Sequence, residues 1–510
     1  MRARTDPSPA DIDLGTIGGR PLRLTLTGMI AAAAALQVVV WSLAPALLYS
    51  APPLDVVEGY VHGPNWVLTT LKHPALPSWV LEVSRRLTGA VGWPAYVVSQ
   101  LFVAATFALV YALGRQLMPP ERAAAGTLLL PGVVYFAWPS IEFNHNVALM
   151  PLWAGLFYCL WRAVETERQI WWIGTSLVAA AMMYTKLSSG LALVAAAGWL
   201  VSDVKGRHAL TRPAPWLAAS LFVALIIPLY LSLRASNFAP LAYAASRAEA
   251  ATNSGPILFV LAQGLALLGL FALLGVTTLV VRRAGAAPIG APFTLAASDR
   301  SVRYLLAASA APLLLVVLLA TVSGAGLRTS WGAAMLSFVG LLVMTIAGPR
   351  FTRAHLRPLF WSSIGFLIIV PLIFSIVHVV RGGLEPRPSR AHWPRAEISR
   401  AMHAVWTAET GRPLRHVAGQ FWGAGLVALS GRNMPAVIVD GDLASSPGIS
   451  RDDLKRDGVL IVETTGSMAA TQALAKLGPP SKSGQTTFLI PGARRGQSVT
   501  FTWAIIPPAP

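Results

Sequence analysis

Charged residues are scarce in this chain of 510 residues: Asp, Glu, Lys and Arg together make up 12%, whereas hydrophobic residues make up 55%. Soluble domains carry about 25% charged residues. The mean hydropathy is +0.58, and apolar runs near the length needed to cross a bilayer, about 20 residues, recur along the first three quarters of the chain. The sequence therefore predicts a polytopic membrane protein and excludes an ordinary soluble one.

Cysteine is almost absent. The one cysteine, Cys159, lies inside an apolar run, which excludes an intrachain disulfide framework and a cysteine-based metal site. The chain also lacks a Walker phosphate loop, a dinucleotide-binding glycine pattern and an H-E-x-x-H motif. We therefore expect no nucleotide cofactor and no metal site, although a divalent ion that bridges a substrate phosphate and a carboxylate stays an open alternative.

The net charge of +18 arises mainly from Lys and Arg residues that lie singly or in small groups between apolar segments. That placement is typical of the positive-inside rule of membrane proteins. The expected partner of these cations is the lipid bilayer, and nucleic acid is not an expected partner.

Eleven apolar segments are predicted to span the membrane, at residues 28–48, 94–114, 123–138, 147–162, 170–184, 187–202, 215–233, 256–281, 303–322, 331–348 and 359–380. The third to the sixth are short for a bilayer of about 30 Å, so tilted, re-entrant or wrongly divided segments stay an alternative among them. Basic residues are concentrated in one of the two sets of loops. This asymmetry favours a cytoplasmic N-terminus and, with eleven spans, an external C-terminal domain.

The composition changes after Arg381, where a linker rich in Pro and Arg leads into a more polar tail. Short buried strands are predicted in HVAGQ, PAVIVDG and GVLIVET, helices in AEISRAMHAVWTAETG and SMAATQALAKLG, and an antiparallel end near TTFLI and VTFTWAI. We therefore expect a membrane domain over residues 1–384 and a small soluble α/β domain over residues 385–510.

Ionisable residues gather in the loops that this topology places outside. The stretch PPLDVVEGYVHGPNWVLTTLKHPALPSW holds Asp55, Glu58, His62, Lys72 and His73, and three further loops read PSIEFNHN, YTKLSSG and GAGLRTSWG. Ionisable groups at membrane depth cost several kcal/mol unless they are paired or hydrated. A shared cavity at the outer face would explain all four loops, and the alternative is that loops are polar because they touch water.

Two features of the first outer loop suggest chemistry. Asp55 and Glu58 lie three residues apart, so a helical turn would place them on one face, where a carboxylate in an apolar cleft can act as a general base. Asp55 could instead be an N-cap of a capping box. Lys72, followed by His73 and Pro74 on a stiffened backbone, could bind phosphate or lie at the membrane surface with its ammonium group in water.

The first outer loop resembles the corresponding segment of bacterial glycosyltransferase family 39. Four later segments also resemble this family, in the same order: FNHNVALMPLW, WRAVETERQIWW, YTKLSSGL and LRTSWGAAMLSFVGLL. This family has the GT-C fold and includes relatives of the protein O-mannosyltransferases and of the lipid A aminoarabinose transferase. Its usual K-H-P-P-L stretch has Ala75 in place of the second proline here. The resemblance implies an all-α polytopic membrane fold with a small C-terminal α/β domain.

The resemblance also implies a function. Such enzymes move a sugar from a polyprenyl-phosphate donor to a cell-envelope acceptor (lipid, glycan or protein) at the outer face of the bacterial cytoplasmic membrane. Carried over by position, Asp55 would be the catalytic carboxylate with Glu58 in support. The donor phosphate would be bound by Lys72, His73, Lys186 and Arg328. The predicted substrate-binding residues are His62, Trp66, Glu142, Asn144, His145, Tyr184 and Trp331.

Two other classes of protein stay open from the residues alone. A transporter or flippase of a lipid-linked or anionic substrate would also need polar groups in a membrane cavity, although such proteins tend to show repeated halves and broken helices at the midplane. An envelope scaffolding protein would use the outer loops only to bind partners. The chain shows no internal repeat, which favours the enzyme.

Overall fold

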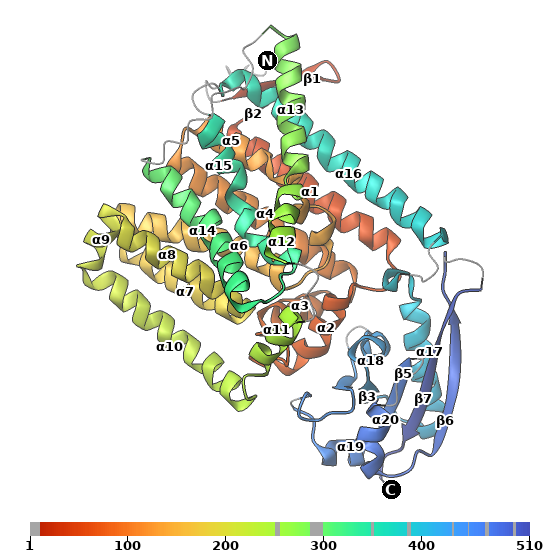
Figure 1. Cartoon of the computed structure of the whole chain (residues 1–510). Helices are drawn as coiled ribbons and strands as arrows, with labels where there is room; N and C mark the ends of the chain where they lie inside the picture. The colour runs from red at the N-terminus through yellow and green to blue at the C-terminus, as the bar shows by residue number, and fades with distance from the viewer. Residues whose placement is uncertain are drawn as a thin grey trace, which may run out of the picture. The chain divides into compact units, whose positions relative to one another are not determined.

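The computed structural model describes residues 11–249, 255–285, 299–347, 351–384, 389–430, 433–446, 448–464, 469–492 and 496–509. These residues form two compact units, and each unit combines segments that are far apart in the sequence. Unit 1 comprises residues 1–41, 99–141 and 145–372. Unit 2 comprises residues 42–98, 142–144 and 373–510. Figure 1 shows the elements of both units along the chain.

Unit 1 is almost entirely helical. Its helices are α5 (Pro120–Leu128), α6 (His145–Thr166), α7 (Gln169–Thr185), α8 (Gly190–Ser202), α9 (Val204–Leu210), α10 (Pro213–Ala235), α11 (Ala239–Glu249), α12 (Pro256–Leu265), α13 (Leu268–Arg283), α14 (Arg300–Ser323) and α15 (Val339–Ala347). Three long helices, α1 (Leu26–Leu48), α4 (Trp93–Leu117) and α16 (Leu356–Leu384), run from one unit into the other. A hairpin of β1 (Ile12–Ile17) and β2 (Arg20–Leu24) precedes α1, and the sequence had not indicated it.

Eight helical segments in the described part of the chain are long and apolar enough to cross a membrane, and two bent helix pairs raise the number to ten. The bent pairs are residues 120–141, which turn by 77°, and 187–210, which turn by 98°. They cover the predicted third and sixth spans. The predicted fifth span is α7, which has 17 residues. The expected all-α polytopic fold is confirmed, and the shortness of three predicted spans accounts for the difference from eleven.

Charge inside unit 1 is neutralised locally. Arg300 at the start of α14 pairs with Asp203 at 2.8 Å and also with Glu165. Its guanidinium lies 4.4 Å from the Trp161 ring and 5.4 Å from the Trp199 ring. These contacts join α6, the α8–α9 corner and α14, because Asp203 is the N-cap of α9 and accepts a hydrogen bond from its backbone. A buried charge is stable only with partners of this kind.

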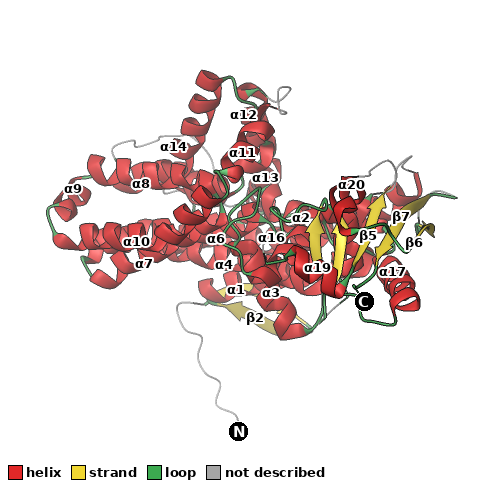
Figure 2. Cartoon of the chain, turned by 90° about the horizontal axis from the view of Figure 1, so that it is seen from below, coloured by secondary structure: helices red, strands yellow, loops and turns green. Residues whose placement is uncertain are grey.

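Unit 2 contains α2 (Leu54–His62), α3 (Leu76–Thr88) and the C-terminal α/β domain. The domain holds α17 (Arg395–Thr410), β3 (His416–Gly419), α18 (Phe421–Ala428), β4 (Ala436–Val439), α19 (Arg451–Asp457), β5 (Val459–Thr464), α20 (Ala469–Leu474), β6 (Lys482–Leu489) and β7 (Ser498–Ile506). Figure 2 shows its strands in yellow among red helices. The small C-terminal sheet domain predicted from the sequence is confirmed.

The sheet of unit 2 has the order β4-β3-β5-β7-β6, with β3 parallel to β4 and β5 and the last two strands antiparallel. Apolar side chains of α19 and α20 pack with Ala418, Ile438 and Ile461 in one core cluster. Helix α18 contacts the parallel strands and also α2. The sequence did not predict α18, whose residues FWGAGLVA lie between two predicted strands. This helix joins the α/β domain to α2.

Candidate active site

Asp55 lies in the first turn of α2 and contacts the segment Glu142–Asn144. The Asn144 side-chain amide donates to Asp55 Oδ2 at 3.1 Å, and the Asp55 backbone N–H donates to Glu142 Oε1 at 2.8 Å. The N-cap of α2 is Pro53, so the alternative in which Asp55 caps the helix is wrong. The helix begins there because proline suits the entry to a helix and a carboxylate in the first turn is favoured by the helix dipole.

Glu142 has an unusual protonation equilibrium. The pKa of its carboxyl is raised to about 7, chiefly by burial and also by the nearby charges of Asp55 and Glu58, against the opposing effects of the Asp55 backbone N–H and of Arg390. A negative charge near a carboxyl group disfavours its ionisation. A carboxyl group whose pKa lies near 7 can gain or lose a proton near neutral pH, which suits acid–base chemistry.

Lys72 lies beside the second carboxylate of α2. Its ammonium Nζ is 2.7 Å from Glu58 Oε2 and 4.1 Å from the centre of the Phe421 ring, which belongs to α18. The Lys72 and Glu58 side chains are 27% and 14% exposed, so both are shielded from bulk water. We call the group of Asp55, Glu58, Lys72, Glu142 and Asn144 the carboxylate site.

The loop between α2 and α3 is held by its own hydrogen bonds. The His73 backbone N–H donates to Thr70 Oγ1 at 3.1 Å, and the Thr70 hydroxyl donates to the His73 carbonyl at 3.1 Å. Trp66 adopts a left-handed conformation with φ of 49° and stacks with Arg86 at 5.4 Å. Burial, together with the charge of Lys72, lowers the pKa of His62 to about 4, so His62 is neutral at pH 7.

Close packing of α18 against α2 fixes the position of the carboxylates. A side chain at Gly425 would place its Cβ 2.5 Å from Val57 Cγ1 and 3.2 Å from Val61 Cγ2. Only glycine lets the two helices approach this closely. The α/β domain thereby braces the helix that carries Asp55 and Glu58.

A second group of predicted residues lies in unit 1. The Lys186 ammonium donates to Asn146 Oδ1 at 2.6 Å and lies 5.8 Å from the centre of the Trp331 ring. Lys186 follows α7 and is 9% exposed. We call Asn146, Lys186 and Trp331 the Lys186 cluster. An amide oxygen and an aromatic face are both suitable partners for an ammonium group.

The other predicted residues of unit 1 are arranged differently. The Tyr184 hydroxyl donates to the Leu225 carbonyl at 3.1 Å, so its contact is with α10. His145 is the first residue of α6, and Arg328 is exposed before a short 3-10 helix. Lys72 and His73 belong to unit 2, whereas Lys186 and Arg328 belong to unit 1. The shared phosphate site of these four residues stays a prediction.

Sequence reasoning missed three residues that influence the carboxylate site. Phe421 contacts Lys72, the charge of Arg390 favours ionisation of Glu142, and the charge of Lys72 favours ionisation of Asp440. All three come from the C-terminal part of the chain, more than 200 residues after the residues with which they interact. No local pattern signals such a contact, because only the tertiary fold brings these segments together.

The comparisons with known proteins concern the family and the fold of the chain. Residues 72–231 match the family described as dolichyl-phosphate-mannose-protein mannosyltransferase. The matched segment contains Lys72, Glu142, Asn144 and Lys186, and it begins after Asp55 and Glu58. No curated protein matches the chain.

Solved structures similar to this chain include ArnT from Cupriavidus metallidurans in the apo state. The two sequences are 13% identical, the match covers 93% of this chain and 98% of that chain, and the TM-score is 0.57. The chain has a GT-C glycosyltransferase fold. The resemblance stated from the sequence is thereby confirmed. The GT-C fold agrees with the multi-pass membrane architecture and the small C-terminal domain.

Two further solved structures are more distant. ArnT from the same organism bound to undecaprenyl phosphate has 13% identity, the same coverage of 93% and 98%, and a TM-score of 0.46. The oligosaccharyltransferase of Archaeoglobus fulgidus in the apo form has 12% identity, coverage of 91% of this chain and 69% of that chain, and a TM-score of 0.43.

Proposed function

We propose that this protein is an integral-membrane glycosyltransferase that moves a sugar from a polyprenyl-phosphate donor to an acceptor hydroxyl of the cell envelope. The reaction would take place at the outer face of a bacterial cytoplasmic membrane, with the N-terminus in the cytoplasm and the C-terminal domain, residues 385–510, in the periplasm. The family match over residues 72–231 and the similarity of fold to ArnT support this class of reaction.

The observation that carries the proposal is the arrangement of Asp55. Asn144 donates to one of its carboxylate oxygens, and the Glu142 carboxyl binds its backbone N–H. These two contacts orient the Asp55 carboxylate and leave it able to accept a proton. A positioned carboxylate of this kind contributes about 10²–10⁴-fold to a rate as a general base.

In the proposed step, Asp55 takes the proton of the acceptor hydroxyl while the hydroxyl oxygen attacks the anomeric carbon of the sugar. A new carbon–oxygen bond forms, and the bond between the anomeric carbon and the phosphate oxygen breaks. The polyprenyl phosphate leaves with the electron pair of that bond. Attack opposite to the leaving group inverts the anomeric configuration, and no covalent intermediate with the enzyme is needed.

Cations stabilise the phosphate as negative charge develops on the leaving oxygen. Lys72, His73, Lys186 and Arg328 are the residues proposed for this role. Glu58 would hold Lys72 in position through their ion pair of 2.7 Å. The residues proposed to contact the sugar, the acceptor or the lipid-linked donor are His62, Trp66, Glu142, Asn144, His145, Tyr184 and Trp331.

The experiment incubates the full-length protein in lipid with a panel of polyprenyl-phosphate sugars and envelope lipids and measures transfer. Asp55→Asn is expected to lower kcat by about 10²-fold or more, because the amide cannot accept the proton. Asp452→Asn is the matched control, because the Asp452 side chain is 90% exposed on α19, and it should retain full activity. Thermal unfolding of both variants checks that the fold is intact.

Two results would contradict the proposal. Full transfer by Asp55→Asn would show that another group is the base. Movement of the lipid-linked substrate across the bilayer by the wild type, with no transfer to any acceptor in the panel, would favour the transporter.

A further inference from the structure

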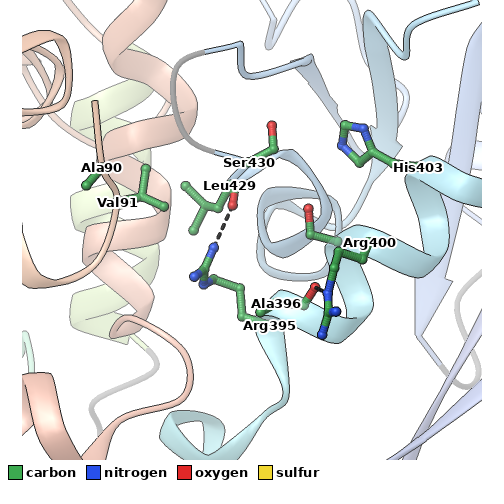
Figure 3. Close-up of a pocket in the computed structure, with 9 residues that line it drawn as sticks. Ala90, Val91, Arg395, Ala396, Arg400, His403, Leu429 and Ser430 are labelled. Carbon is green, nitrogen blue, oxygen red and sulfur yellow. Dashed lines mark hydrogen bonds between the residues drawn. The ribbon is translucent and has the colours of Figure 1, made fainter. Parts of the chain in front are cut away.

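Unit 2 contains a cavity of about 520 Å³ that is separate from the carboxylate site (Figure 3). Its walls come from the first half of α17, the end of α18 and the turn before α4. The lining residues are Ala90, Val91, Arg395, Ala396, Ser399, Arg400, His403, Leu429 and Ser430. Its volume lies within the range of about 300–1,000 Å³ that is usual for ligand sites.

The lining of this cavity is cationic. The described lining residues include two arginines, two serines and a histidine whose pKa is lowered by burial, and none of these described residues is Asp or Glu. Glu397 lies on the same helix but is exposed and does not line the cavity. A concave surface with cationic groups and no carboxylate favours an anionic ligand.

Arg395 is the central cation. Its Nη1 donates to the Leu429 carbonyl at 2.6 Å, and Figure 3 shows the guanidinium reaching from α17 toward Leu429 and the turn of Ala90 and Val91. Burial lowers the pKa of this guanidinium. Within the described ranges, no ion pair joins Arg395 or Arg400 to a carboxylate. A partly buried guanidinium that binds only a neutral carbonyl keeps donors for a bidentate anion such as phosphate.

Part of the cavity wall lies next to a candidate membrane span. Ala90 and Val91 directly precede α4, one of the helices long and apolar enough to cross a membrane. In the same region, Leu87 at the end of α3 is 80% exposed and Trp93 at the start of α4 is 50% exposed. An exposed leucine and tryptophan beside a span are typical of a surface in contact with lipid headgroups.

We propose that this cavity binds the phosphate group of an anionic membrane lipid, with Arg395 as the main ligand and Arg400 as a second cation. The site is distinct from the carboxylate site. It lies at the C-terminal end of α18, whereas Phe421, which contacts Lys72, lies at the N-terminal end. The eight residues of α18 separate the two ends by about 12 Å.

The test measures the binding of fluorescent phosphatidic acid to the full-length protein in detergent, with phosphatidylcholine as the uncharged comparison. Phosphatidic acid should bind more tightly than phosphatidylcholine, because phosphatidic acid alone presents a net negative phosphate. Arg395→Gln should weaken phosphatidic acid binding about tenfold, through loss of a charge-assisted hydrogen bond. Arg400→Gln should weaken it less, because Arg400 is exposed. The matched control, Arg412→Gln, replaces an exposed arginine of the same domain that does not line the cavity, and it should bind like the wild type.

A second variant guards against misfolding of Arg395→Gln. Ala90→Glu adds a carboxylate to the opposite wall without removing the bond to Leu429, and it should also weaken phosphatidic acid binding. Equal affinity of the wild type, Arg395→Gln and Ala90→Glu would overturn the proposal. If inorganic phosphate competed as strongly as the lipid, the cavity would bind a soluble anion and the assignment to a lipid would be wrong. The test does not depend on transferase activity, so its outcome is separate from that of the proposed function.

Discussion

The carboxylate site of unit 2 and the Lys186 cluster of unit 1 hold their charges in opposite ways. In the carboxylate site, Lys72 faces Glu58, and Asp55 lies against Glu142 and Asn144, so charges meet other charges within the protein. In the Lys186 cluster, an ammonium group is held by an amide oxygen and an aromatic ring. Both of these contacts are with neutral groups that suit an ammonium group.

This difference indicates different tasks. Paired carboxylates with one pKa near 7 are suited to moving protons. A cation held by dipoles is suited to stabilising an anion, because little of its charge is neutralised by these contacts. We therefore expect substitutions in the two regions to affect different measurements.

Among the substitutions that test this comparison, Lys186→Met is expected to have the largest effect on transferase activity. Loss of a charge-assisted contact with the donor phosphate is worth about 1.5–3 kcal/mol, which corresponds to a decrease of about 10–100-fold in kcat/KM for the donor. The measurement is transfer as a function of donor concentration. The melting temperature should change little, because Asn146 can bind water in place of the ammonium.

Lys72→Met is the partner experiment. It should lower the melting temperature as well as activity, because it leaves the Glu58 carboxylate, 14% exposed, without the ion pair. If Lys186→Met lowered the melting temperature and Lys72→Met did not, the contrast between the two regions would be wrong.

The next effect concerns pH and Glu142. Its folded-state pKa, about 7, lies above the ordinary value of 4.5. Its contribution to stability is therefore fully present below about pH 4.5 and is lost as the pH rises through 7. Between pH 5 and pH 8, the free energy of unfolding of the wild type should fall by about 2 kcal/mol relative to that of Glu142→Gln. This value allows for the partial exposure of the Glu142 side chain.

Thermal unfolding of both proteins at a series of pH values measures this difference. His62 acts in the opposite direction, because its pKa is lowered, but it is present in both proteins and cancels in the comparison. Parallel curves for the wild type and Glu142→Gln would show that Glu142 titrates normally.

The smallest effect is expected for Phe421→Ala. A cation–π contact at a partly exposed site contributes about 0.5–1 kcal/mol, so activity should fall only a few-fold. Phe421→Trp is the control, because a larger aromatic ring retains the contact with Lys72 and should preserve activity. A loss as large as that of Asp55→Asn would mean that the α/β domain takes part in catalysis beyond holding Lys72 in place.

Local pattern was enough to predict much of this fold. Apolar runs predicted the long helices, since each crossing segment must bury its backbone hydrogen bonds within itself. Alternating turns and short apolar strands predicted the C-terminal sheet. The same signals did not reveal α18, whose glycines and apolar residues resemble part of a buried strand. The shortness of the predicted third and sixth spans left re-entrant or wrongly divided segments as an alternative, but it did not locate the bends at residues 120–141 and 187–210.

The candidate site divides in the same way. The sequence by itself determined that the chain is a polytopic membrane protein. It also identified Asp55, Glu58 and Lys72 as candidate site residues, because ionisable residues rarely cluster in so hydrophobic a chain. Only the tertiary structure decided that Glu142 and Asn144 contact Asp55, that Phe421 covers Lys72, and that Arg395 lines a cationic cavity. Composition and spacing act over a few residues, whereas these contacts depend on how distant helices pack, and packing is a property of the whole chain.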